Sequence, residues 1–183
     1  MRRWIAIPLL ALALTACDDG ATTAEAPPPV EPTREAITHF GRMILVDHDG
    51  PRGQIHLENG EVLWFPAVRD VKAFTLLPEE SKDVAAMYVS DMATAQSWEE
   101  PDTWMPARDA FYVIGSDARG GMGMPEPVPF SDRSAADAFA NERGGDVVMW
   151  DDIPDDYILS SPEEGTDMDM GMHMNMDRGE GHQ

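Results

Sequence analysis

Nine residues near the C-terminus, from Met168 to Met176, combine side chains that bind soft metal ions. Five methionines alternate there with small or polar residues, and one histidine lies among them. Thioether sulfur is polarisable, favours Cu(I) and needs no deprotonation before it binds. A tail without a role would also be polar and oxidation-prone, but nothing in it would favour methionine at every second position. We therefore predict copper contacts from Met168, Met170, Met172, His173, Met174 and Met176.

A glycine-rich stretch from Arg119 to Glu126 carries two further methionines, Met122 and Met124. Glycines let a backbone approach a ligand closely, and a surface loop gives methionine little to pack against. We expect metal contact from Met122 and, with less support, from Met124. The alternative is that one of them packs under the loop as a gap filler.

Met43 and His39 form a third candidate group, because His39 closely precedes Met43 at the start of an apolar run. Taken alone, however, the sequence favours a core role for Met43 over a role as a metal ligand. His48 and His56 are weaker candidates, since an isolated exposed histidine is usually only solvated. We expect the remaining internal methionines to be mainly structural: Met87, Met92, Met105 and Met149.

The N-terminus predicts export and lipidation. Arg2 and Arg3 precede an apolar run that is too short to span a membrane as a mature helix, and the run ends in Leu14-Thr15-Ala16-Cys17. Small residues before a cysteine are typical of a bacterial lipoprotein cleavage site, so Cys17 is the expected lipid carrier. We expect a periplasmic protein anchored to a membrane by lipid, and Asp18 and Asp19 favour the inner membrane.

The amino-acid composition limits the kinds of partner and metal ligand that the protein can use. The chain of 183 residues has a net charge of −21, and removal of residues 1–16 makes it more negative. Nucleic acid is a poor partner for such a surface, whereas cations and basic protein surfaces are suitable ones. Cys17 is the one cysteine, so a copper site in the mature protein must use methionine, histidine, carboxylate or backbone ligands. The sequence does not indicate an oligomeric state.

The pattern of composition predicts four segments. We expect a signal peptide at 1–16, a lipidated flexible tether at 17–35 with three consecutive prolines, a folded domain at 36–159, and a disordered acidic tail rich in methionine and histidine at 160–183. Hydrophobic periodicity and turn residues predict helices at 67–77 and 131–143, with Ser131 as an N-cap. Strands are expected at 43–47, 53–58, 62–65, 84–89, 110–114 and 147–150.

A weak internal repeat supports an α+β fold with two similar halves. Phe65 and Phe74 are nine residues apart and bracket the first expected helix, and Phe130 and Phe139 do the same for the second. Each half, at about 40–90 and 107–159, then has the order strand, strand, helix, strand. No nucleophile elbow, phosphate loop or His-Glu-x-x-His cluster is present, so we expect a protein that is not an enzyme.

The folded region resembles the NosL family, the accessory lipoproteins of nitrous-oxide reductase. The resemblance covers nearly all of 38–159 and rests on these segments: His39-Phe40-Gly41-Arg42-Met43-Ile44, Gly53-Gln54-Ile55, Trp64-Phe65, Val68-Arg69-Asp70, residues 73–80, Tyr88-Val89, Asp91-Met92, residues 110–116, Gly121-Met122-Gly123, Pro125-Glu126, residues 128–131 and 153–157. It implies a periplasmic chaperone that supplies Cu(I) for the copper–sulfide centre of that reductase. It also implies a fold of two α+β halves.

One departure from the family pattern concerns the metal site. Relatives typically read His-Tyr-Cys-Gly-Met at 39–43, whereas Gly41 stands here at the cysteine position and Arg42 at the glycine. Met43 and Met122 match family methionines, and Met124 stands where relatives often carry a residue that is not a ligand. We therefore expect an all-thioether site in the domain, with His39 as a possible additional ligand, and a tail that captures copper.

Two other functions remain open from the sequence. The missing cysteine favours an assembly or docking lipoprotein that acts on the reductase without carrying metal. The methionine-rich tail is also compatible with a general periplasmic copper buffer.

Overall fold

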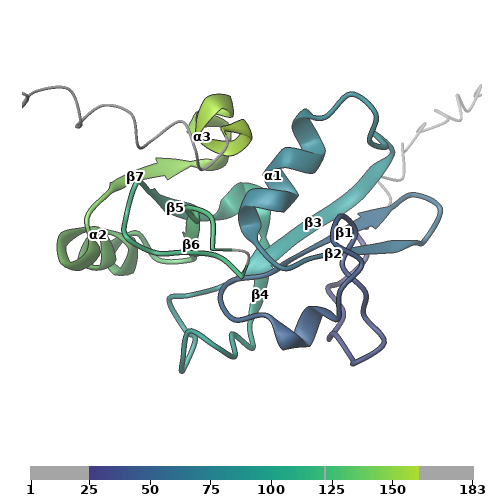
Figure 1. Cartoon of the computed structure of the whole chain (residues 1–183), viewed down its shortest axis with the longest axis horizontal. Coiled ribbons are helices and arrows are strands. Elements are labelled where there is room, and N and C mark those ends of the chain that lie inside the picture. Colours follow the sequence, from purple (N-terminus) through teal and green to yellow (C-terminus); the bar gives the residue numbers. More distant parts are fainter. Residues whose placement is uncertain (1–24, 122, 161–183) are drawn as a thin grey trace, which may run out of the picture.

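The computed structural model describes residues 25–121 and 123–160 (Figure 1). Its first half contains β1 (Gly53–Leu57), β2 (Val62–Phe65), α1 (Val68–Leu76), β3 (Val84–Ser90) and β4 (Trp104–Pro106). Its second half contains β5 (Phe111–Ile114), β6 (Val128–Phe130), α2 (Arg133–Arg143), β7 (Asp146–Met149) and α3 (Asp155–Leu159).

The two halves share one topology, which confirms the α+β fold with similar halves. The first sheet has the order β2-β1-β3-β4 and the second β6-β5-β7, and all neighbours are antiparallel. In each half the first strand is flanked by the second and third. The repeated phenylalanines are in contact in both halves: ring centroids are 5.7 Å apart for Phe65 and Phe74, and 5.2 Å apart for Phe130 and Phe139.

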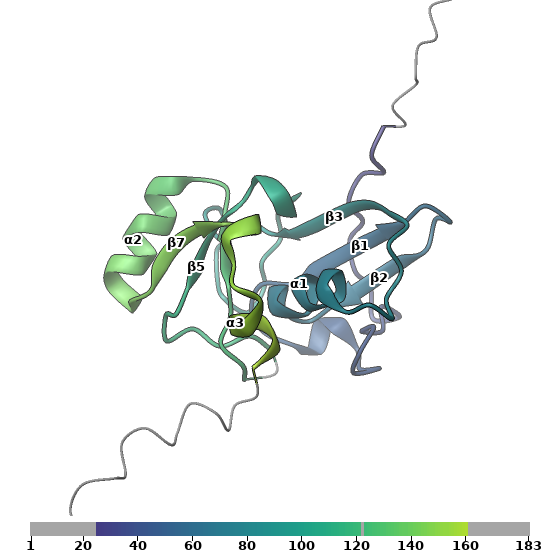
Figure 2. The same cartoon turned by 90° about the horizontal axis from the view of Figure 1, so that it is seen from above.

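The helix α1 joins the halves. It lies next to α3, with both helices between the two sheets (Figure 2). Its Arg69 donates hydrogen bonds to the carbonyl oxygens of Tyr157 and Ser160, and Lys72 donates to that of Trp150. Both cationic side chains are buried. Because an unpaired buried charge is costly, these charge-assisted bonds fix α1 against the second half.

A proline-rich segment covers the sheet face opposite α1. The backbone of Val30 donates to Gln54 Oε1 and accepts from Gln54 Nε2, and the Tyr88 hydroxyl donates to the Pro27 carbonyl. All five residues of β1 are therefore buried, including the polar Gln54 and His56. The described end of the segment expected to be a free tether is thus bonded to the domain.

Several expected elements differ in the structure. The strand expected at 43–47 is wrong: a single bridge pairs Ile37 with Ile44, and a 3-10 turn follows at Leu45–Asp47. No strand was expected at the positions of β4 and β6, and each of them pairs with the strand that precedes it in the chain. The N-cap of α2 is Asp132 rather than Ser131, because the Asp132 carboxylate accepts from the Ala135 amide.

Other sequence predictions fall outside the described ranges. These are the signal peptide, Cys17, Met122 and the tail from 161 to 183. Among the described helices, none has the length and apolar character needed to cross a bilayer.

Candidate metal site

A tight hairpin at 37–44 carries the first candidate ligands. The Thr38 amide donates to the Met43 carbonyl at 2.8 Å, and the Arg42 amide donates to the Thr38 carbonyl at 3.1 Å. The buried Thr38 hydroxyl accepts from the Met43 amide at 3.0 Å. The His39 amide donates to the Trp64 carbonyl at 2.8 Å, which attaches the hairpin to β2. Met43 is therefore held on a short, hydrogen-bonded loop.

The Met43 side chain folds back over Gly41. A Cβ atom placed on Gly41 would lie 2.5 Å from Met43 Cε and 3.5 Å from Thr38 Oγ1. The thioether thus lies beside the position where the family resemblance expects a cysteine. Arg42, at the expected glycine position, has a φ of 55°, in the left-handed region that glycine adopts most easily.

The His39 ring is held by Glu80 and by three phenylalanine rings. Its Nε2 lies 3.0 Å from Glu80 Oε2, just beyond the C-terminus of α1. Its ring packs against Phe40, Phe65 and Phe74, with centroid distances of 4.9, 5.7 and 5.5 Å. Because Nε2 is engaged, only Nδ1 is available to a metal, and a carboxylate partner of this kind would orient the ring.

A second tight loop, at 119–125, carries the other candidate ligands. Arg119 and Pro125 form a bridge, the Gly120 amide donates to the Met124 carbonyl at 3.0 Å, and the Gly123 amide donates to the Gly120 carbonyl at 2.8 Å. Gly123 has a φ of 75°, so the turn uses the freedom of a glycine at that position. Met124 is half-buried at the end of this loop.

The carboxyl group of Glu126 clamps this loop to the start of α1. Its Oε1 accepts from the Val68 amide at 2.6 Å, and its Oε2 has no hydrogen-bond partner among the described residues. A Cβ on Gly120 would collide with Oε2 and lie 3.1 Å from Ala67 Cβ. Glu126 is completely buried, and burial raises its pKa well above the ordinary value, which favours the neutral form.

The two methionine-bearing loops both contact the chain where β2 leads into α1. The hairpin is bonded to Trp64, whereas a Cβ on Gly121 would lie 3.0 Å from the Pro66 carbonyl oxygen. The same Cβ would lie 3.0 Å from His48 Cβ. The structure therefore brings Met43, the 119–125 loop and the half-buried His48 to one region. Soft thioethers with a nearby imidazole suit Cu(I).

The remaining methionines are mostly structural, as expected. Met105 is buried in the main core, Met87 packs against it, and Met92 packs against the smaller core of the second half. Met149 is an exception, because 37% of it is exposed on β7. Within the described ranges, no group of three or more His, Cys, Asp or Glu residues is placed to hold a metal ion.

The sequence alone gave little or no indication that His48 and Glu126 belong to this region. His48 reaches the 119–125 loop only through the fold, so its position along the chain gave no signal. Glu126 belongs to a chain rich in acidic residues without a pattern. One available signal was its place directly after a glycine-rich loop and Pro125, where a carboxyl group can bind the free amides of a helix start.

The architecture defines a two-sheet α+β domain in which two methionine-bearing loops contact the segment that leads into one helix. The NosL family model matches residues 29–158, and this chain belongs to the NosL family. The copper-binding lipoprotein NosL of Achromobacter cycloclastes is 38% identical over 169 residues, which cover 90% of this chain and 86% of that protein. The copper-binding lipoprotein NosL of Stutzerimonas stutzeri is 32% identical over 167 residues, covering 90% and 85%.

A solved structure shows the same fold. The crystal structure of the copper chaperone NosL from Shewanella denitrificans matches with a TM-score of 0.62 and 30% sequence identity. The match covers 69% of this chain and 97% of that one. The share of this chain is smaller because the match concerns the folded domain.

Proposed function

We propose that this protein is a periplasmic lipoprotein copper chaperone that binds Cu(I) and delivers it for assembly of the copper–sulfide centre of nitrous-oxide reductase. Family membership and the similarity to copper-binding lipoproteins support copper binding and lipidation. The observation that carries the proposal is the Met43 side chain, which folds back over Gly41 on a hairpin bonded to Trp64, two residues before the Pro66 that the second methionine-bearing loop approaches.

The chemistry of the ligands fits a carrier. Neutral thioethers bind Cu(I) without releasing protons and leave no charged ligand behind when the ion departs. Met43 and Met122 are the proposed ligands in the domain, with Met124, His39 and His48 as further candidates. The hairpin and the loop are each closed by backbone hydrogen bonds, which hold the ligands ready before copper arrives. Copper is the cargo, and no catalytic step is proposed.

Location follows from the same proposal. Lipid on Cys17 holds the protein at the periplasmic side of the inner membrane, and the acidic surface excludes nucleic acid as a partner. The methionine-rich tail captures additional copper, so deletion of residues 166–183 lowers the number of Cu(I) ions bound per protein. An unchanged stoichiometry would contradict this role of the tail.

The test of the domain site is an anaerobic titration of the mature chain with Cu(I) against a competing chelator. Met43→Leu and Met122→Leu should each weaken the tightest site, because leucine keeps the volume and removes the sulfur. Met149→Leu is the matched control, since that methionine is exposed on β7, and it should leave binding unchanged. Equal affinity in all three variants would contradict a site at these loops.

A gain-of-ligand variant sharpens the test. In Gly41→Cys the new Cβ meets only the flexible end of Met43 at 2.5 Å, so a small rotation of that side chain makes room. A thiolate is a stronger Cu(I) ligand than a thioether, and the variant should bind Cu(I) more tightly and in a pH-dependent way. Delivery is measured as copper transfer to metal-free reductase, which should be faster from the loaded chaperone than from the chelator at equal free Cu(I).

The outcomes separate the competing functions. Copper held only by the tail would leave a buffer attached to a docking domain. No binding in any form of the protein would favour an assembly lipoprotein that acts without metal.

A further inference from the structure

The outer edge of β3 is only partly paired. β1 pairs with β3 from Val84 to Val89, whereas β4 pairs only with Tyr88–Ser90 on the other side. In the described parts of the chain, residues 84–87 therefore have a neighbouring strand on one side only. An open edge of this kind presents backbone N–H and C=O groups with which an additional extended segment can pair.

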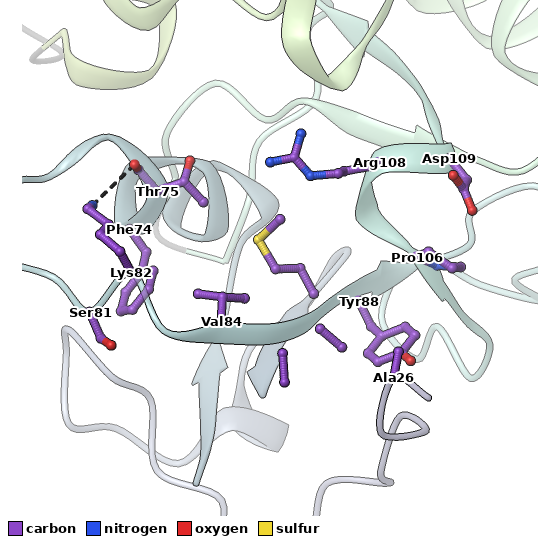
Figure 3. Close-up of a pocket in the computed structure, with 13 residues that line it drawn as sticks. Ala26, Phe74, Thr75, Ser81, Lys82, Val84, Tyr88, Pro106, Arg108 and Asp109 are labelled. Atoms are coloured by element: carbon purple, nitrogen blue, oxygen red, sulfur yellow. Dashed lines mark hydrogen bonds between the residues drawn. The ribbon is translucent and has the colours of Figure 1, made fainter. Parts of the chain in front are cut away.

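A groove of about 600 Å³ runs along this open edge (Figure 3). Phe74 and Thr75 of α1 line one wall, and Val84 and Met87 of β3 line the floor. The groove is large enough for several residues of an extended chain. Its apolar lining also suits the side chains on one face of such a chain.

Two cationic side chains reach the groove on an otherwise strongly acidic protein. Lys82 and Arg108 lie at its two ends in Figure 3, and Asp109 is the one carboxylate among the lining residues. Lys82 is held in place by hydrogen bonds to the carbonyl oxygens of Leu77 and Thr75, and Arg108 pairs with the exposed Asp151 at 3.1 Å. The Lys82 ammonium and the Arg108 guanidinium can therefore pair with carboxylates of an incoming segment.

The methionine-rich tail has the pattern that this groove requires. Methionine occurs at every second position from Met168 to Met176, and successive side chains of a strand point to opposite faces. A strand of these residues would therefore carry all five methionines on one face. The run contains Asp169 and is flanked directly by Asp167 and Asp177, and these carboxylates can pair with Lys82 and Arg108.

The tail is long enough to reach the groove. The described chain ends at Ser160, whose carbonyl accepts from Arg69 Nη2 at 2.8 Å. Arg69 and Thr75 lie six residues apart along α1, a rise of about 9 Å, and Thr75 lines the groove. The seven residues from 161 to 167 span up to about 23 Å when extended. Met168 can thus lie at the groove without any change in the domain.

We propose that residues 168–176 dock as an additional strand on the open edge of β3, with their methionine side chains packed against Phe74, Val84 and Met87. Backbone pairing with 84–87 fixes the strand, and Lys82 and Arg108 select its charge. The methionine run is then stored against the domain, and metal capture by these thioethers competes with docking. Docking itself needs no metal, so it is independent of the proposed copper site.

The test uses the metal-free mature chain with Cys17→Ser and a nitroxide attached at Gly171→Cys. Gly171 alternates with the methionines, so the label points away from the packed face. Amide NMR signals of residues 84–87 and of Arg108 should lose intensity, whereas those of α2 should not. Full intensity at 84–87, or loss that depends on protein concentration because a second copy binds, would overturn the proposal.

Reversing the charges of Lys82 and Arg108 tests whether the tail docks in this groove. Lys82→Glu with Arg108→Glu should restore the amide intensities at 84–87. Arg133→Glu with Arg143→Glu on α2 is the matched control, since it makes the same change of charge and breaks comparable exposed ion pairs with Asp137 and Asp117. The control should retain the intensity loss. The proposal is wrong if both double variants behave alike.

Hydrogen exchange provides a second measurement without a label. Amides of residues 84–87 that face the open edge should exchange more slowly in the full mature chain than in a chain ending at Ser160. Ala26 also lines the groove, so residues 18–25 are the competing occupant. Slow exchange that persists in the shortened chain would assign the groove to that N-terminal segment and overturn docking of the tail.

Discussion

In the first half of the domain, β2 enters α1 through Pro66 and Ala67, and the Val68 amide is bound by Glu126 from the second half. In the second half, β6 enters α2 through Ser131 and Asp132, and the Ala135 amide is bound by Asp132 itself. The Ser131 amide is bound by Asp91, which comes from the first half. Both strand-to-helix connections are therefore stabilised by a carboxyl group, but the groups lie in opposite environments.

The two environments shift the pKa values of these carboxyl groups in opposite directions. Burial raises the pKa of Glu126 well above its usual range, whereas a hydrogen bond from the Ser134 side chain, with further bonds from backbone amides, lowers the pKa of the exposed Asp132. The exposed cap stabilises one helix locally. The buried one joins the halves and holds the 119–125 loop, so the candidate metal site lies at the connection that depends on long-range contacts.

Removal of the buried carboxyl group should have the largest effect. Glu126→Ala leaves a cavity and an unbound amide at the start of α1, so we expect a loss of about 3 kcal/mol in the free energy of unfolding, measured by urea denaturation. Glu126→Gln keeps the volume and the oxygen that accepts from Val68, and it should cost less. Equal losses in both variants would show that neither the hydrogen bond to Val68 nor the packing of the side chain accounts for the contribution of Glu126 to stability.

Two carboxyl groups, one in each half, should make contributions to stability that change with pH in opposite directions. Burial raises the pKa of Asp70, in the first turn of α1, from 3.8 to about 6. The folded state therefore holds this proton more tightly, and its stabilising effect, at most about 3 kcal/mol, is present below pH 4 and is lost as the pH rises to about 6. Relative to the wild type, Asp70→Asn should gain stability across this range in urea titrations at several pH values.

The control for this prediction is Asp132→Asn at the start of α2. Since the folded pKa of Asp132 is lowered, the wild-type carboxylate stabilises the protein above the unfolded pKa and ceases to do so in acid. Asp132→Asn should therefore lose stability relative to the wild type as the pH rises toward about 4, and the difference should stay constant above that pH. Parallel pH profiles for the two variants would contradict the comparison.

Crowding at Gly120 should produce a smaller effect. The Cβ of Gly120→Ala would press on Glu126 Oε2 and on Ala67 Cβ, so we expect a destabilisation of about 1–2 kcal/mol. The same substitution in a Glu126→Ala background should cost clearly less, because the space is vacated. A double-mutant cycle from thermal or urea unfolding measures this coupling, and additive costs would show that the two residues act separately.

The smallest effect concerns the hairpin, which has no counterpart in the second half. Arg42 has a φ of 55°, so Arg42→Gly should relieve backbone strain and raise stability by about 0.5–1 kcal/mol in urea unfolding. The arginine is exposed, and its loss removes no buried contact. A decrease in stability would mean that this side chain has a structural role.

Locally encoded elements were predictable from the sequence. Asn59-Gly60 gives the β1–β2 turn, where Gly60 has a φ of 85°, and helical periodicity gives α1 within one residue at each end. The repeated phenylalanine spacing revealed the two halves. By contrast, β4 and β6 are three residues long and contain proline, so only their pairing with the preceding strands β3 and β5 defines them.

The candidate site was predictable only in part. Residue chemistry and family resemblance selected Met43 and the 119–125 loop, and the fold places both beside the β2–α1 connection. The burial of Glu126 and the approach of His48 to Gly121 depend on contacts between residues 58 or more positions apart. No local pattern encodes such contacts, because they arise when the two halves pack together.

The proline-rich segment on the sheet determines how far the domain can move from a membrane. Since Pro27 and Val30 are bonded to Tyr88 and Gln54, only nine residues, 18–26, separate Cys17 from the fixed chain. They span at most about 30 Å. With lipid on Cys17, the domain would search for partners by lateral diffusion within a thin layer above the bilayer. Its effective concentration toward other membrane-bound proteins would then be far higher than its average concentration in the compartment.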